Sequence, residues 1–167
     1  AREFYESRSQ LNLLVAGNQL SKSSTMIRKN IEFACNKNLW TEIWKTTPKT
    51  FWYFYPSDSV ATHEVLKKWI PEFLPRGAMK NHEWYGWDIQ MSSGEVEAIH
   101  FRSGVSIYFH TYGQKFTVLQ TATVHMISGD EEMPVPLVDE LVARLFSTNG
   151  IFNTCFTATI GQEVWYH

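Results

Sequence analysis

A glutamate and a histidine, Glu97 and His110, have the residue types and the spacing that favour acid–base chemistry. A carboxylate opposite an imidazole orients the ring and holds its proton, which is how a general base is prepared. Asp88 falls in the neighbouring row of the same predicted surface and completes the acid–base set. A direct Glu97–His110 pair favours the charged imidazolium, so we expect the pKa of His110 to lie above its ordinary value of about 6.5.

These residues meet only if the segment from about 82 to 127 folds as an antiparallel meander of four strands. Runs rich in aromatic and β-branched side chains are separated here by three turn signals: Ser93-Gly94, Ser103-Gly104 and Gly113-Gln114. With two-residue turns, residue 92 faces 95, residue 102 faces 105 and residue 112 faces 115. The resulting row across one face of the sheet contains Gln90, Glu97, His110 and Thr117.

Period-two alternation divides the meander between an apolar face and a polar face, and it places His100 on the apolar one, opposite Ile107. The polar face also carries aromatic side chains, which a purely solvated surface does not need. A planar ring stacked on them gains about 1 to 3 kcal/mol per base, with Glu97 or Asp88 accepting its N–H groups. The candidate residues for binding a ligand or partner are Trp84, Asp88, Gln90, Glu97, Phe101, Tyr108, His110, Tyr112 and Thr117.

The rest of the chain alternates helical and extended patterns around this meander. Helices are expected at about 2–19, 21–35, 57–70 and 137–146, and the segment Ser57-Asp58-Ser59 is expected to cap the third. Strands are expected at 51–55 and at 151–160 with 164–167, the last two as one or two closing strands. The acidic, proline-bearing stretch 129–136 is expected to be a connector. Helices segregated from a run of strands predict a single α+β domain over 1–167, in which the helices and closing strands pack on one face of the four-stranded antiparallel meander.

Composition restricts the class of protein more than it identifies a function. The 15 basic and 17 acidic residues give no basic field, which argues against binding an extended nucleic acid. No apolar run approaches the roughly 20 residues that span a bilayer, and no signal peptide is evident, so we expect an intracellular, soluble, cytoplasmic protein. The 7 Trp, 7 Tyr and 11 Phe exceed what a core alone requires and favour a recognition surface.

Familiar catalytic signatures are absent from our motif search. We find no phosphate-loop pattern, Gly-x-Gly-x-x-Gly, His-Glu-x-x-His, Cys-x-x-Cys or Gly-x-Ser-x-Gly, and we expect no cofactor and no metal site. The leading interpretation is a non-enzymatic binding or regulatory domain whose aromatic-rich sheet face recognises a protein partner or a small aromatic, nucleotide-like ligand.

Two other interpretations of the polar face stay open. Polar cross-strand pairs are ordinary on solvated sheets and contribute roughly 0.2 to 1 kcal/mol each, so the face need not bind anything. Alternatively, the chain is a small cofactor-independent hydrolase, lyase or isomerase that uses Glu97, His110 and Asp88. That enzyme requires the polar face to be concave and covered by helices rather than open to water.

Overall fold

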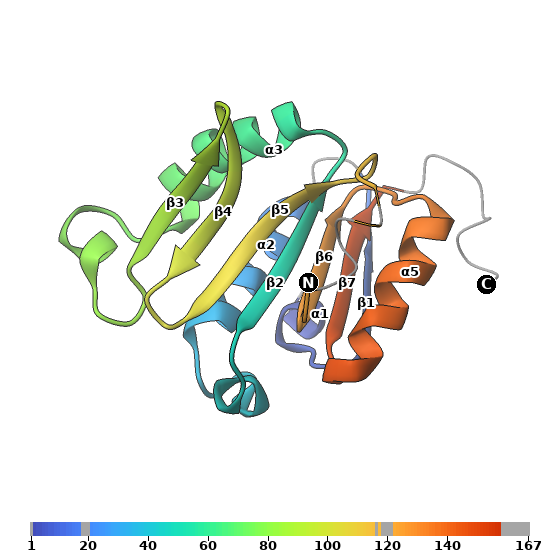
Figure 1. Cartoon of the computed structure of the whole chain (residues 1–167), viewed down its shortest axis with the longest axis horizontal. Helices are drawn as coiled ribbons and strands as arrows, with labels where there is room; N and C mark the ends of the chain where they lie inside the picture. Colours follow the sequence, from blue (N-terminus) through green and yellow to red (C-terminus); the bar gives the residue numbers. More distant parts are fainter. Residues whose placement is uncertain (1, 18–20, 116, 118–121, 158–167) are drawn as a thin grey trace.

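The computed structural model describes residues 2–17, 21–115, 117 and 122–157. Their strands form one sheet in the order β1-β7-β6-β2-β5-β4-β3 (Figure 1). The strands are β1 (Leu11–Val15), β2 (Lys49–Tyr55), β3 (Trp87–Ser92), β4 (Glu95–Phe101), β5 (Val105–Thr111), β6 (Met126–Asp130) and β7 (Ile151–Phe156).

The sheet is mixed and mostly parallel. Strands β1, β7, β6, β2 and β5 are parallel to their neighbours, and only β4 and β3 continue the sheet in antiparallel pairing. The fold is therefore α/β, and the predicted α+β class with a four-stranded antiparallel meander is wrong. Three of the predicted strands do pair antiparallel, as β3, β4 and β5. The fourth is not observed among the described residues: its last two positions, Met126 and Ile127, begin β6, which pairs with β2 and β7 instead of with β5.

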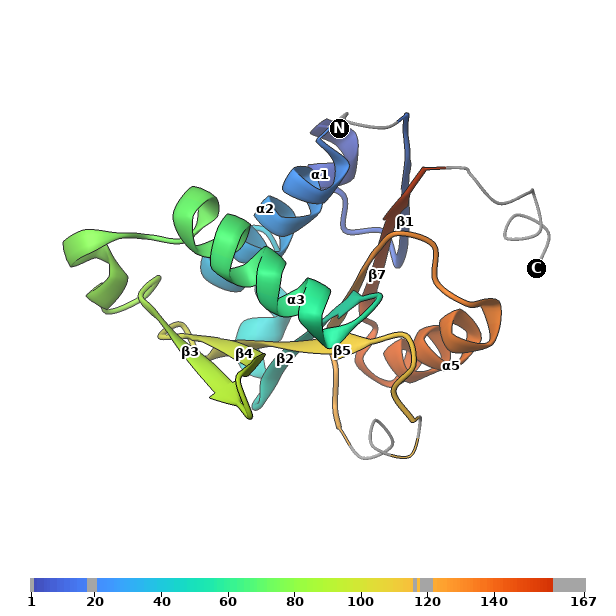
Figure 2. The ribbon, with the colours of Figure 1, turned by 90° about the horizontal axis from the view of Figure 1, so that it is seen from above.

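Helices cover both faces of the parallel part of the sheet. They are α1 (Arg2–Glu6), α2 (Lys22–Cys35), α3 (Asp58–Glu64), which continues as the π-helix η2 (Val65–Phe73), and α5 (Val135–Leu145). Figure 2 shows α1, α2 and α3 on one side of the sheet and α5 on the other. Short 3-10 turns occur at η1 (Thr41–Lys45), η3 (Gly77–Asn81) and η4 (Phe146–Thr148). Within the described residues, no helix is long and apolar enough to cross a membrane.

The aromatic run of β2 explains why this strand occupies the middle of the sheet. Phe51, Tyr53 and Tyr55 pack into the core beneath α2 and η2. Trp52 and Phe54 point to the opposite face and pack against α5. A strand that is buried on both faces needs a continuous apolar sequence, which is what parallel sheets require. The predicted buried strand at 51–55 is thus confirmed.

Two local irregularities change the register that the turn signals predicted. Ser92 pairs with Glu95 as expected, but a bulge follows, so that Gln90 pairs with Ala98 and Glu97 is the extra residue. At the next turn His100 pairs with Ser106, one residue away from the predicted register. Because side chains alternate, both shifts move residues of β4 to the other face.

The helix predictions were correct for three segments and wrong for part of the first. The helices at 21–35, 57–70 and 137–146 are observed as α2, α3 with η2, and α5. Residues 2–19 were predicted as one helix, yet Leu11–Val15 is a strand that pairs in parallel with β7. Gly129 and Asp130, predicted within a connector, end β6. The expected fourth meander strand falls partly on 116 and 118–121, which lie outside the described residues.

Candidate functional site

The carboxyl ends of the parallel strands meet at one edge of the sheet, the upper edge in Figure 1. Helix α2 leaves β1 toward one face, and α5 follows β6 on the other face (Figure 2). Open α/β sheets bind ligands in the crevice outside the strand ends where connections depart to opposite faces. This edge is therefore the candidate site.

The first turn of α2 has the properties of an anion-binding helix terminus. Ser21 precedes the helix in the left-handed conformation, with φ 56°, and makes no side-chain cap to the helix. The first N–H groups of a helix lack intrahelical partners, and the helix dipole adds partial positive charge there. Lys22 and Ser23 begin the helix directly after this turn. A phosphate group fits such an uncapped terminus.

A carboxylate from another strand meets this turn. The Ser23 hydroxyl donates a hydrogen bond to Asp130 Oδ1 at 2.9 Å. Asp130 ends β6 and is only 7% exposed, and burial raises the pKa of its carboxyl. Hydrogen bonds from Ser23 and Cys155 oppose that rise. The pair joins the start of α2 to the end of β6 across the intervening strand β7.

Lys22 folds back over the loop that leads to it. Its ammonium donates to the carbonyl oxygens of Ala16, at 2.8 Å, and Gly17, at 2.6 Å. It also donates to the Thr157 hydroxyl, at 2.8 Å, just beyond the end of β7. The carboxyl ends of β1, β7 and β6 thus converge on one lysine, one serine and one aspartate.

The residues at this edge fit a magnesium ion that is shared with a phosphate. Mg²⁺ in phosphate sites takes one or two carboxylates, and its other ligands are water and phosphate oxygens. Ser23 and Asp130 offer one hydroxyl and one carboxylate, 2.9 Å apart. The part of the chain that the structure describes has no group of three His, Cys, Asp or Glu residues able to hold a metal without such help. A magnesium ion held by Ser23 and Asp130 would therefore need phosphate oxygens or water to complete its coordination.

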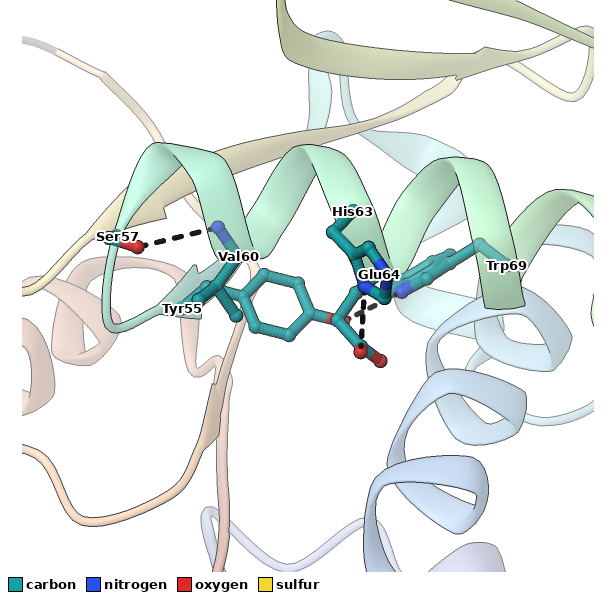
Figure 3. A network of polar contacts seen from close by, with 6 residues as sticks. All are labelled: Tyr55, Ser57, Val60, His63, Glu64 and Trp69. Carbon is teal, nitrogen blue, oxygen red and sulfur yellow. Dashed lines mark hydrogen bonds and ion pairs between the residues drawn. The ribbon is translucent and has the colours of Figure 1, made fainter.

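Helix α3 and η2 follow the carboxyl end of β2 (Figure 3). The Trp69 indole on η2 donates to the Tyr55 hydroxyl at 2.9 Å, which fixes the helix against the end of β2. Ser57 caps α3 by accepting from the Val60 N–H at 3.3 Å, as the sequence predicted. Lys68 on η2 and Glu64 on α3 act on Asp130 through their charges, and they lower and raise its pKa respectively.

Our motif search missed this site because neither glycine of the phosphate-loop pattern is present. The pattern Gly-x-x-x-x-Gly-Lys-Ser/Thr follows a strand and opens a helix. Here Ala16 and Ser21 stand at the two glycine positions, ahead of Lys22 and Ser23. Ser21 nevertheless has the positive φ that glycine adopts most easily. A search for Lys-Ser at the start of a predicted helix, with the glycines left free, would have found it.

Comparisons with known proteins give a likeness in fold. No family model and no curated protein matches the chain. A solved structure described as the large terminase from the thermophilic bacteriophage D6E aligns with 91% of this chain, with a TM-score of 0.60 and 15% identity. The aligned part is 34% of the terminase chain, so this chain spans about a third of that protein. At this identity the similarity shows a shared fold.

The predicted Glu97–His110 pair is not formed. His110 is packed between Trp52 and Phe54, with ring centroids 5.0 Å and 5.4 Å away, and its Nδ1 contacts Gln114 Oε1 at 2.8 Å. Burial lowers the pKa of His110 to about 4, against smaller raising effects of Gln114 and the Glu97 charge. The expected pKa above 6.5 is therefore contradicted, because burial outweighs the carboxylate.

A different polar network occupies the sheet face. Gln90 donates to Glu97 at 2.5 Å, and its amide oxygen contacts His100 at 2.7 Å. The other ring nitrogen of His100 contacts the Ser106 hydroxyl at 2.7 Å. The shifted register places His100 on the polar face, so its predicted apolar position opposite Ile107 is wrong. Asp88 pairs with His100 in register and is exposed.

The remaining predicted binding residues lie in separate places. Tyr108 is half-buried with its ring edge-on to His100, whereas Phe101 belongs to the core on the α2 side. The Trp84 indole donates to the Cys35 carbonyl at the end of α2. Thr117 is exposed. Tyr112 alone among them reaches the edge that carries Lys22, Ser23 and Asp130, where its hydroxyl donates to backbone carbonyls of Asp130 and Glu131.

A separate cavity of about 430 Å³ opens at the opposite edge of the sheet. Its lining includes Gln10 before β1, His125 before β6 and Ile151 at the start of β7. These are amino ends of parallel strands. The cavity is therefore distinct from the edge that carries Lys22, Ser23 and Asp130.

Proposed function

We propose that this chain binds and hydrolyses a nucleoside triphosphate with Mg²⁺ at the Lys22–Ser23–Asp130 edge. The observation that carries the proposal is the 2.9 Å hydrogen bond between Ser23, on the first turn of α2, and Asp130, at the end of β6. In phosphate-loop nucleotide hydrolases the loop serine or threonine and an aspartate from another strand together hold the ion. The loop lysine approaches the terminal phosphates.

Each residue of this edge has a defined task in that reaction. Lys22 exchanges its contacts with loop carbonyls for phosphate oxygens, and the N–H groups of α2 neutralise further phosphate charge. Ser23 and Asp130 hold Mg²⁺, which when bound neutralises charge on the phosphates. Glu131, exposed directly beyond Asp130, is the candidate general base.

The proposed reaction is an in-line displacement at the terminal phosphorus. Glu131 accepts a proton from water, and the water oxygen forms a bond to that phosphorus. The bond from the phosphorus to the bridging oxygen breaks, and its electron pair stays on the nucleoside diphosphate. Inorganic phosphate is the second product. Positioning and charge neutralisation account for most of the rate gain in such reactions.

The fold likeness supplies a context for the proposal. A domain with this fold makes up about a third of a bacteriophage large terminase. We therefore propose that the chain is the nucleotide-binding part of a terminase-like protein. The likeness to the terminase supports the proposed kind of protein, and the Ser23–Asp130 geometry supports the proposed nucleotide hydrolysis.

Nucleotide binding measured by calorimetry tests the proposal. We expect Mg-ATP to bind to the parent, and Lys22→Ala and Ser23→Ala to weaken binding at least tenfold. Ser24→Ala is the matched control, because Ser24 lies on the same turn but Ser23 supplies the bond to Asp130. A parent that binds no triphosphate with any base, or a Ser23→Ala variant with parental affinity, would contradict the proposal.

The polar sheet face remains a second candidate function, as a surface for a protein partner. It is favoured by the exposed Asp88 and Gln90 on a part of the sheet that no described helix covers on that side (Figure 2). Replacing the exposed Asp88 by arginine should remove partners recovered from the native cell and leave the folded stability within about 0.5 kcal/mol. Unchanged recovery would remove this candidate.

A further inference from the structure

Tyr112 connects two strand ends at the proposed nucleotide site. It follows β5, and its backbone N–H donates to the Tyr55 carbonyl at the end of β2, at 3.3 Å. Its hydroxyl donates to the Asp130 carbonyl and, at 3.2 Å, to the Glu131 carbonyl. Strand β2 lies between β5 and β6, so this one side chain spans the end of a strand to reach the site.

Glu131 has a backbone conformation that needs such support. Its φ is 72°, in the left-handed region that a residue with a Cβ rarely adopts and occupies only with strain. Its N–H donates to the Cys155 carbonyl of β7 at 2.8 Å. The peptide units around Glu131 are therefore fixed from β7 on one side and by Tyr112 on the other.

The Tyr112 ring is itself held in place. It stacks on Phe54 with ring centroids 6.5 Å apart and an interplanar angle of 14°. Phe54 is fully buried in the core beneath α5. A rigid ring gives the hydroxyl a fixed reach, and this is the usual structural requirement for a group that orients another.

We propose that Tyr112 is a positioning residue for Glu131. The hydroxyl holds the left-handed turn that directs the Glu131 carboxylate toward the water that attacks the terminal phosphate. This inference rests on the proposed nucleotide hydrolysis and deepens it. The residue acts through the backbone of Glu131 and takes no proton itself, so its loss affects the rate of hydrolysis rather than the binding of nucleotide.

Steady-state kinetics of Tyr112→Phe test this role, because the variant keeps the ring and removes only the hydroxyl. We expect kcat for Mg-ATP to fall 10- to 100-fold and KM to stay within about twofold. Glu131→Gln should lower kcat further, and adding Tyr112→Phe to Glu131→Gln should change nothing more. The control is Tyr85→Phe, since the Tyr85 ring stacks on His82 in the loop before β3. An unchanged kcat in Tyr112→Phe, or losses that multiply in the double variant, would overturn the inference.

A double-mutant cycle measured by unfolding tests whether the Tyr112 hydroxyl holds the turn at Glu131, and it requires no enzymatic activity. Glycine adopts a φ of 72° without strain, so Glu131→Gly removes the need for a clamp. Tyr112→Phe should therefore lower the unfolding midpoint less in the Glu131→Gly background than in the parent. Equal losses in both backgrounds would show that the hydroxyl does not hold the turn. A parent that binds no triphosphate instead refutes the proposed function, and this cycle still reports on the clamp.

Discussion

At the scale of the residue, Asp130 combines a buried position with a charge that the proposed function requires. Burial raises the pKa of its carboxyl above the ordinary 3.8. The folded state therefore holds this proton more firmly than the unfolded state. The contribution of the Asp130 proton to the free energy of unfolding is therefore full below the unfolded pKa and is lost as pH rises through the folded pKa. A functional carboxylate thus lowers stability at neutral pH, as sites with retained strain commonly do.

Asp130→Asn is expected to separate stability from function. The amide still accepts from Ser23 and has no charge to bury, so the variant should gain about 1 kcal/mol at neutral pH, or roughly 2 to 4 °C in Tm. Its advantage over the parent should vanish at acidic pH, and its affinity for Mg-nucleotide should fall at least tenfold. Denaturant unfolding over a pH series measures this, and identical pH profiles for the two proteins would contradict it.

At the scale of the element, the packing of α1 depends on a buried lysine of α2. Lys29 is fully buried, and its ammonium donates to the carbonyls of Phe4 and Ser7, both at 2.6 Å. Burial lowers the pKa of Lys29 from 10.5 to about 8. Between about pH 8 and 10.5, the unfolded state therefore binds more protons than the folded state. The contribution of Lys29 to stability is present above the unfolded pKa and is lost as pH falls through 8.

Lys29→Met should remove this pH dependence. The variant should have its largest stability advantage over the parent below the folded pKa of Lys29. That advantage should shrink by roughly 1 to 3 kcal/mol as pH rises and the lysine of the unfolded parent also loses its proton. Lys29→Arg is the control, because arginine stays charged throughout. Chemical denaturation at several alkaline pH values tests the prediction. A constant difference across the series would show that Lys29 titrates alike in both states.

Strand β5 tests the assignment of faces in the sheet. Phe109 is 7% exposed and packs against Trp69, with ring centroids 5.1 Å apart. Its replacement by alanine should cost about 3 to 5 kcal/mol through the cavity that it leaves. Tyr108→Ala, one position away on the half-buried polar face, should cost less. Equal losses in denaturant unfolding would mean that both faces of β5 are equally covered.

The elements also show what local sequence can and cannot predict. The aromatic run of β2 and the Ser57 cap of α3 have local causes, and both were predicted correctly. The register of β4 was missed because the bulge at Glu97 has no glycine or proline to mark it. Leu11–Val15 was assigned to a helix because its leucines also fit a helical stripe, and a short apolar run does not distinguish the two.

At the scale of the whole molecule, the site depends on pairings that the sequence does not display. Strands β1 and β7 are parallel neighbours, although Leu11 pairs with Phe152 at the other end of the described chain. Parallel pairs carry no turn signal, because a helical crossover separates their strands. Ser23 and Asp130 were therefore not placed together from sequence. The Lys22-Ser23 pair could be recognised locally, but the strand that precedes it, β1, was assigned to a helix.

Ligand binding should consequently stabilise the whole chain. A ligand at 100 times its Kd, bound only to the folded state, adds about 2.7 kcal/mol to the unfolding free energy. For a domain of this size we expect Mg-ATP to raise Tm by about 5 to 10 °C. Chelation of Mg²⁺ with EDTA should remove most of the rise, because Asp130 and the phosphates then repel each other. Lys22→Ala should abolish it, whereas Tyr112→Phe should retain it.

Hydrogen exchange would locate the effect that the melting curve reports. Protection by Mg-ATP should concentrate at the first turn of α2 and at the end of β6, because in the proposed complex α2 contacts the phosphates and Asp130 contacts Mg²⁺. The cavity at the amino ends, which includes His125, and the polar face around Gln90 should exchange as they do without nucleotide. Protection at either of those places, with none near Ser23, would show that the nucleotide does not bind at the carboxyl ends of the strands. The Ser23–Asp130 bond would then be a structural tie between α2 and β6.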